Sequence, residues 1–363
     1  MRHPLLLPSL LLLSATYLAP QSAHAGQAAP VGVDALSQDD VAKAVSALKQ
    51  SFVRPEALSD PELARATLQG LMDRLAPEVN LVTGTGAPAA ASPFYSENHA
   101  AHTGYLRLGE LTPENVDKAR QALKAWAAQG VTAVVLDLRG TPASSDFDAG
   151  AALEGLFCAK ATDMFSLYPG NAVETGSNSS AEGRTYSAQA DPLFSGILVV
   201  LVDQATSEAP EAIAASLQKC AKALVVGDTT AGRAFLYHDI PLDGAMLRVA
   251  VAQVLLPDGK KLGETGLKPD IDVPLGATSK NDLMRTVSAK GVESVIQERD
   301  RPHLNEAALV SGSNPEVDEI EAEESGIKPP TPLIDRQLQS ALDLVTSISI
   351  YQAKAGATPS SGE

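Results

Sequence analysis

The sequence predicts an α/β protein with a helical region on either side of its core. Between residues 104 and 277, short apolar runs rich in β-branched residues alternate with amphipathic helical stretches. Such alternation is typical of parallel strands joined by helical crossovers. The flanking segments 26–82 and 278–354 carry helix signals instead. A content of 44% hydrophobic and 20% charged residues is typical of a folded globular chain.

Residues 1–25 are expected to be a secretory signal. Arg2 and His3 give a basic start, residues 5–13 form an apolar stretch, and Ala23-His24-Ala25 matches a small-x-small cleavage pattern. The apolar stretch is too short to span a membrane. We therefore expect an exported, soluble, periplasmic protein with no membrane span.

Two helices are expected in the N-terminal region, residues 26–82. Ser37 is placed to cap the first helix, and Asp60-Pro61 precedes the second. The apolar positions at helical spacing are Val41, Val45, Leu48 and Phe52 in the first, and Leu63, Leu68, Leu71 and Leu75 in the second. Residues 83–103, rich in Gly, Pro, Ala and Ser, have the composition of a linker.

The core, residues 104–277, is expected to open with an alternating strand at Gly104–Leu108. Thr112 and Pro113 are start signals for the next helix, and Gly130 ends it. Residues 134–139 then predict a buried strand. Asp137 and Arg139, two positions apart on that strand, are interpreted as a buried structural ion pair.

The next part of the core predicts strand, tight turn, helix and a second strand. Residues 197–202 form a continuous apolar run, which is typical of a buried parallel strand. Pro210 suits the first position of a helix because its missing N–H costs nothing there. Glu211 suits the positive end of the helix dipole. A strand-turn-helix of this kind is a common place for catalysis.

The remaining strands are expected at 164–168 and 184–187, as a pair of edge strands, and at 247–256. Beyond the core, the region 278–354 is expected to be helical, with an acidic loop at 316–324. An amphipathic helix is predicted at 335–351.

The tail 355–363 is expected to be disordered.

Composition and spacing exclude several kinds of function. A formal charge of −16 without a basic cluster argues against nucleic acid as a partner. No metal or other cofactor is expected, because there is no phosphate-binding glycine motif and the histidines lack ligand spacing. Those outside the signal are His99, His102, His238 and His303. Cys158 and Cys220 either form a disulfide or remain as two buried thiols; the sequence leaves both open.

Two motifs resemble those of the carboxyl-terminal processing peptidases, the tail-specific serine proteases. Residues 137–144, Asp-Leu-Arg-Gly-Thr-Pro-Ala-Ser, lie on that family's Asp-Leu-Arg-x-Asn-Pro-Gly-Gly. Residues 266–273, Gly-Leu-Lys-Pro-Asp-Ile-Asp-Val, repeat its closing signature Gly-Ile-x-Pro-Asp-Ile-x-Val. The resemblance runs from about Phe52 to Val273. It implies a Clp-protease/crotonase-like ββα spiral core.

The resemblance also implies partners. The family's N-terminal helical region often mediates dimerisation, which implies a homodimer; the alternative is a helical hairpin that packs on the core. The family's activity implies an extended peptide or a protein C-terminus as ligand. These peptidases usually carry a PDZ domain where residues 83–103 stand, and this segment is too short to form one.

The resemblance extends to the active-site segment, Asn-x-x-Thr/Ser-Ala-Ser-Ala-Ser-Glu-Ile, whose last Ser is the nucleophile. Laid on it without gaps, residues 203–212 place Pro210 at the nucleophile. In the following Gly-x-x-Thr-Phe-Gly-Lys-Gly motif, Arg233 stands in place of the Lys base, and Tyr237 takes the position of a supporting Gln. The oxyanion-hole positions fall on Ala143 and Glu211.

These replacements remove the chemistry of a Ser–Lys dyad. Such a dyad needs a hydroxyl to attack and a neutral amine to accept its proton. Pro210 has no hydroxyl, and a guanidinium such as that of Arg233 stays charged at physiological pH. Ala143 and Ser144 replace a glycine pair, so a Cβ restricts the backbone that would supply an oxyanion donor.

We therefore predict a catalytically inactive pseudo-peptidase with a peptide-binding, regulatory or scaffold role. The alternative is an active serine endopeptidase that uses Ser207 or Ser144 as nucleophile. A triad of Ser207 with His238 and Asp239 is disfavoured, because adjacent residues on a strand point to opposite faces.

Overall fold

The computed structural model describes residues 33–83, 92–99, 102–169, 183–263, 265–275, 279–297 and 333–356. The expected signal at 1–25, the acidic loop at 316–324 and residues 357–363 of the expected tail lie outside these ranges. The chain divides into two compact units, Met1–Leu71 and Met72–Glu363.

The first unit contains the expected N-terminal helices. Its elements are η1 (Val33–Ala35), α1 (Gln38–Ser51), η2 (Pro55–Leu58) and most of α2 (Asp60–Leu75). The Ser37 side chain caps α1 by accepting a hydrogen bond from the Asp40 N–H, as its position predicts. No residue of α1 or α2 is buried, so the apolar faces of both helices remain exposed.

The second unit is built on a six-stranded sheet of order β11-β8-β7-β4-β3-β2. Its strands are β2 (Tyr95–His99), β3 (Thr103–Arg107), β4 (Ala133–Asp137), β7 (Ile197–Val202), β8 (Leu224–Gly227) and β11 (Ile271–Asp272). Within this sheet, every neighbouring pair is parallel from β3 through β4, β7 and β8 to β11. The remaining strand, β2, pairs with β3 in the antiparallel direction. The alternation of strands and helices therefore predicted the parallel core correctly.

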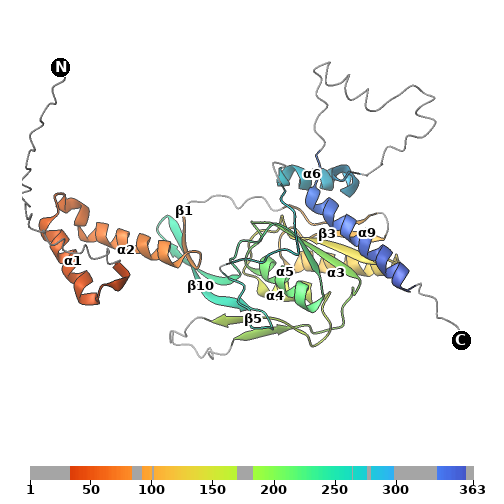
Figure 1. The fold of residues 1–363 in the computed structure, drawn as a ribbon, viewed down its shortest axis with the longest axis horizontal. Helices are drawn as coiled ribbons and strands as arrows, with labels where there is room; N and C mark the ends of the chain where they lie inside the picture. Colours follow the sequence, from red (N-terminus) through yellow and green to blue (C-terminus); the bar gives the residue numbers. More distant parts are fainter. Residues whose placement is uncertain are drawn as a thin grey trace, which may run out of the picture. The chain divides into compact units, whose positions relative to one another are not determined.

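Helices cover both faces of this sheet (Figure 1). One face packs on α3 (Pro113–Ala128), α4 (Phe147–Glu154) and α5 (Ala209–Cys220). The other packs on α6 (Lys280–Lys290), η3 (Val292–Val295) and α9 (Arg336–Gly356). Alternate residues of one strand serve the two cores, since successive side chains point to opposite faces. On β4, Val134 belongs to the first core and Val135 to the second.

A second, antiparallel sheet lies beside the first core. Its order is β1-β10-β5-β6, with β9 also paired to β10. The strands are β1 (Val79–Thr83), β5 (Asp163–Pro169), β6 (Arg184–Ser187), β9 (Phe235–Leu242) and β10 (Ala245–Leu255). The prediction that 164–168 is an edge strand is wrong, because β5 pairs with β10 on one side and β6 on the other.

Two segment boundaries also differ from expectation. The region expected to be helical, 26–82, ends in β1, whose Leu81 lies opposite Leu247 of β10. The expected linker, 83–103, contains β2, whose Glu97 lies opposite Tyr105 of β3. In both cases the partner strand lies later in the chain, so the five residues of each stretch do not by themselves specify the pairing.

The structure joins Cys158 and Cys220 in a disulfide. The bond links the segment after α4 to the last residue of α5. Across the ranges given above, no helix is both long and apolar enough to cross a membrane.

Candidate functional site

The turn between β7 and α5 has an unusual backbone. Asp203 Oδ1 accepts the N–H groups of Ala205 and Thr206, each at 3.0 Å, which closes the first part of the turn. Glu208, at the helix N-cap, has φ 57° and ψ −130°. A residue other than glycine rarely adopts a positive φ, and residues with such a strained backbone cluster at functional sites. The strand-turn-helix that the sequence predicted is therefore present, with strain at its last turn residue.

The turn is bonded to the loop that contains Arg233. The Glu208 N–H donates to the Arg233 carbonyl at 3.1 Å. The Glu211 carboxylate accepts the N–H groups of Gly232 at 2.8 Å and Arg233 at 2.9 Å, together with the Thr230 hydroxyl. The positions aligned with a nucleophile and a base are thus held in neighbouring segments.

The third predicted segment, around Ala143 and Ser144, joins the same place. The Ser144 carbonyl accepts the Ala209 N–H at 3.0 Å, and Ser144 forms a parallel bridge with Glu208. Ala143 is exposed at the rim of this contact. The structure therefore brings together all three segments that the sequence singled out.

Neither residue at the two dyad positions has the required group. Pro210 is buried in the first turn of α5, and its ring has no hydroxyl. Arg233 is exposed, and its guanidinium remains a cation. No proton acceptor of the Ser–Lys kind is formed by these two side chains.

A carboxylate that the sequence analysis did not single out enters the site instead. Glu208 accepts hydrogen bonds from Ser145 Oγ at 3.0 Å and from Arg248 Nη1 at 3.2 Å. Its side chain is 5% exposed, and burial raises the pKa of Glu208 although Arg248 opposes the rise. The ungapped alignment places Glu208 on a serine of the family pattern, and this position could have indicated that Glu208 lies in the site. Nothing in the sequence around Arg248 indicates that it reaches the site.

Tyr237, at the supporting Gln position, packs into the same network. Its hydroxyl donates to the Pro77 carbonyl at 3.1 Å, and Arg248 lies 4.9 Å from the ring centroid. Burial, and to a smaller extent the nearby Glu208 carboxylate, raises the pKa of Tyr237 to about 12. Tyr237 is therefore a hydrogen-bond donor and a stacking surface at neutral pH, not a base.

The alternative nucleophiles lack an activating partner among the described residues. Ser207 is 1% exposed, and its Oγ has no hydrogen-bond partner. Ser144 Oγ accepts the Asp146 N–H at 3.2 Å. Asp239 binds Arg248 at 2.8 Å, and both it and His238 are exposed. The Ser207 triad considered from the sequence is not assembled.

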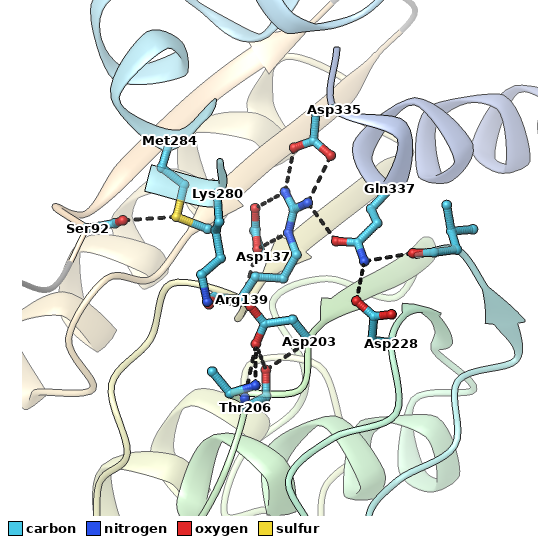
Figure 2. A network of polar contacts seen from close by, with 12 residues as sticks. Ser92, Asp137, Arg139, Asp203, Thr206, Asp228, Lys280, Met284, Asp335 and Gln337 are labelled. Atoms are coloured by element: carbon cyan, nitrogen blue, oxygen red, sulfur yellow. Dashed lines mark hydrogen bonds and ion pairs between the residues drawn. The ribbon is translucent and has the colours of Figure 1, made fainter. Parts of the chain in front are cut away.

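The buried pair predicted on β4 is part of a larger network (Figure 2). Arg139 binds Asp137 at 2.6 Å and Asp335 at 2.8 Å, and its Nη1 donates to Gln337 Oε1 at 2.9 Å. Burial alone would raise the pKa of Asp137, but the Arg139 guanidinium outweighs it and lowers that pKa. The pair is structural, as predicted, and it attaches the start of α9 to the sheet.

Lys280 belongs to the same network in Figure 2 and has two partners there. Its Nζ donates to the Arg139 carbonyl at 2.9 Å and forms an ion pair with Asp203. Lys280 therefore stabilises the turn after β7 and is not placed as a substitute base.

The chain resembles known proteins over this core. Residues 102–273 match the family described as Peptidase family S41. The carboxyl-terminal-processing protease of Picosynechococcus sp. is 30% identical over 200 residues, which cover 54% of this chain and 46% of that protein. The chloroplastic C-terminal processing peptidase of Tetradesmus obliquus is 28% identical over 197 residues, covering 54% and 40%.

Among solved structures, the photosystem II D1 C-terminal processing protease aligns with a TM-score of 0.41 at 24% identity, covering 59% of this chain and 53% of that one. The chain spans less than half the length of the two curated relatives named above. The α/β core, with its Asp-Leu-Arg strand and its closing signature, belongs to peptidase family S41, the family of the carboxyl-terminal-processing proteases.

Proposed function

We propose that this S41 core is a pseudo-peptidase that binds an extended peptide without cleaving it. One observation carries the proposal: the turn before α5 and the loop at Arg233 are hydrogen-bonded together, yet Pro210 and Arg233 supply neither a hydroxyl nor a neutral amine. The scaffold of the dyad is kept while its chemistry is absent.

The surrounding groups support the same conclusion. Glu208 brings a buried carboxylate to the site, where Arg248 and Ser145 hold it. A negative charge there opposes an oxyanion, which an active site must stabilise with donors. The site is therefore adapted to binding groups other than a developing oxyanion.

The free edge of β9 is the proposed peptide site. Among the described strands, β9 pairs only with β10, and it begins two residues after Arg233. An unpaired edge offers a row of N–H and C=O groups to an added strand. The peptide would thus run past Arg233 and Tyr237, and its side chains would meet the Glu208 network.

Strand addition can be tested without altering the protein. A fluorescent unstructured peptide should raise its anisotropy saturably on binding, and the same peptide with N-methylated alternate amides should lose at least about tenfold in affinity. Equal affinity of the two peptides would exclude main-chain pairing as the mode of binding.

Catalytic inertness has a separate test. A fluorophosphonate reagent labels an activated serine, so we expect no labelling of the full chain, and an S41 peptidase with an intact dyad serves as the positive control. Labelling that is lost in Ser207→Ala or Ser144→Ala would instead support the active serine endopeptidase.

We further propose that the protein is exported to the periplasm. The basic, apolar and small-x-small pattern of residues 1–25 supports this, and so does the disulfide, which is typical of oxidising compartments. The segment between β1 and β3 is too short for a PDZ domain, so the peptide site would act without one.

A second copy of the chain is the proposed partner of the N-terminal helices. Apolar side chains of α1 and its C-cap are exposed in the first unit: Val41, Val45 and Leu48 of the helix and Phe52 at the C-cap, at 38%, 37%, 52% and 37%. A helix face of this kind is costly to leave in water and is typical of an interface. Self-association of two identical faces gives a closed, two-fold assembly.

A further inference from the structure

A cluster of possible metal ligands lies apart from the residues of the S41 site. One carboxylate oxygen of Glu154 and the sulfurs of Cys158 and Cys220 all lie within 4.8 Å of one another. Glu154 is the last residue of α4 and Cys220 the last of α5, while Cys158 follows one turn after Glu154. The three side chains therefore meet where two helices end.

Glu154 has no explanation within the fold. Its side chain is fully buried, and neither carboxylate oxygen has a hydrogen-bond partner in the part of the chain that the structure describes. Ser216 is a neighbour, but its hydroxyl donates to the Met164 carbonyl at 3.0 Å. Burial raises the pKa of Glu154 well above its ordinary value, and the Ser216 hydroxyl lowers it by less. A buried carboxyl without a donor is the kind of group that marks a redox or ion site.

We propose that reduction of the Cys158–Cys220 disulfide converts this cluster into a zinc site. Two thiolates and one carboxylate would bind the ion, and a water would complete four-coordination. With the disulfide intact, the sulfurs have no free thiolate to offer, so the site binds metal only in the reduced state.

The reaction balances with a dithiol or a phosphine as reductant. Two electrons and two protons pass to the disulfide, which breaks into two thiols. A dithiol reductant becomes a disulfide, whereas a phosphine takes the oxygen of one water molecule to become a phosphine oxide, and that water supplies the two protons. Zn²⁺ then replaces the two thiol protons and the carboxyl proton, which go to solvent. Three protons are therefore released for each ion bound to the fully protonated cluster.

The geometry suits this exchange. A tetrahedral ion with Zn–S bonds of about 2.3 Å holds two sulfurs roughly 3.8 Å apart, a separation that thiols reach once their covalent bond is broken. The C-terminal ends of α4 and α5 carry partial negative charge, which disfavours free thiolates and favours a cation. Cys220 is only partly buried, so an ion can enter from its side.

The test compares the full chain in its two redox states. After reduction with a phosphine under argon, Co²⁺ titration should give one equivalent of thiolate-to-cobalt charge-transfer absorption, and Zn²⁺ should displace it. The oxidised chain and Cys158→Ser/Cys220→Ser should give none. Glu154→Gln, which keeps the shape of the side chain, should bind at least about tenfold more weakly and release one proton fewer per ion at mildly acidic pH.

Thermal unfolding gives a readout that holds even if reduction loosens the fold. Zn²⁺ should raise the Tm of the reduced wild type and leave that of the oxidised chain unchanged, because it binds only the folded, reduced state. Absence of both saturable binding and a Tm shift in the reduced chain would overturn the proposal. Equal affinity and equal proton release of Glu154→Gln would remove Glu154 from the ligand set and overturn it as stated.

Discussion

The backbone N–H of Glu208 donates a hydrogen bond to the carbonyl oxygen of Arg233 at 3.1 Å. This bond joins the turn before α5 to the loop before β9, and the Glu211 carboxylate adds two more bonds between the same segments. Backbone groups and a buried carboxylate thus hold the arrangement, and none of them depends on a nucleophile or a base. On our proposal that Pro210 and Arg233 stand at the dyad positions, these bonds explain how the arrangement persists without the dyad.

Restoring the dyad should not restore an efficient enzyme. Pro210→Ser with Arg233→Lys would supply the hydroxyl and the amine, but Ala143 still replaces a glycine and Glu208 still places a carboxylate nearby. Loss of one oxyanion donor costs about 10²–10³ in kcat. Turnover of an unstructured substrate by the double variant should therefore stay at least about a hundredfold below that of an intact S41 peptidase. Turnover equal to such a peptidase would show that the remaining site is competent.

The Arg139–Asp335 ion pair should contribute strongly to stability. Both side chains are 2% exposed, so Asp335→Asn leaves a buried guanidinium with one carboxylate instead of two. We expect the free energy of unfolding to fall by about 3–5 kcal/mol in urea denaturation. The matched control is Asp282→Asn, which breaks the exposed pair with Arg285 and should cost about 0–1 kcal/mol. Equal effects of the two variants would contradict a buried network.

Glu154 should make the stability depend on pH. Its folded-state pKa is raised by burial above the ordinary 4.5, so above pH 4.5 the folded chain holds a proton that the unfolded chain has lost. This contribution is fully present below pH 4.5 and is lost as pH rises through the raised value.

Relative to Glu154→Gln, the oxidised wild type should therefore lose stability as pH rises above 4.5, by about 1.4 kcal/mol per pH unit in that window. Denaturation curves at several pH values, with chelator present, measure the difference. Parallel pH profiles for the two proteins would show that the carboxyl is not strained by burial.

The exposed face of α1 should mediate self-association. Leu48→Asp places a charge among Val41, Val45 and Phe52, and we expect the dimer dissociation constant to rise at least about a hundredfold. Sedimentation velocity over a range of concentrations measures this shift. Lys43→Gln, at an exposed pair with Asp40, makes the protein more negative by the same single charge and is the matched control. A wild type that stays monomeric at every concentration would refute the interface.

The local sequence pattern predicted those helices, strands and side-chain pairs that depend only on residues close together in the chain. The β-branched run at 197–202 and the Pro210 start signal gave β7 and α5, because burial and a missing N–H act within a few residues. Asp137 and Arg139 were correctly paired for the same reason. Their third partner, Asp335, is 196 positions from Arg139, and no local signal links them.

The same limit applies to the site and to two strands. Val79–Thr83 and Tyr95–His99 form strands because β10 and β3 lie beside them. The first, although rich in Val and Thr, directly follows a helical region, and the second is a short, mostly polar stretch next to a linker composition. Arg248 reaches Glu208 from the far end of a hairpin, so the pair that occupies the site was not predictable from either motif. The proposal that Pro210 and Arg233 replace a nucleophile and a base rests on alignment with a family pattern, which carries long-range geometry that a single stretch lacks.

The most direct measurement of the account is cleavage of casein, an unstructured substrate, by the purified chain, followed by mass spectrometry of the products. We predict no peptide bond cleavage above that of a mock preparation, because Pro210 and Arg233 cannot attack or deprotonate. Cleavage that disappears in Ser207→Ala or in Ser144→Ala would contradict the account.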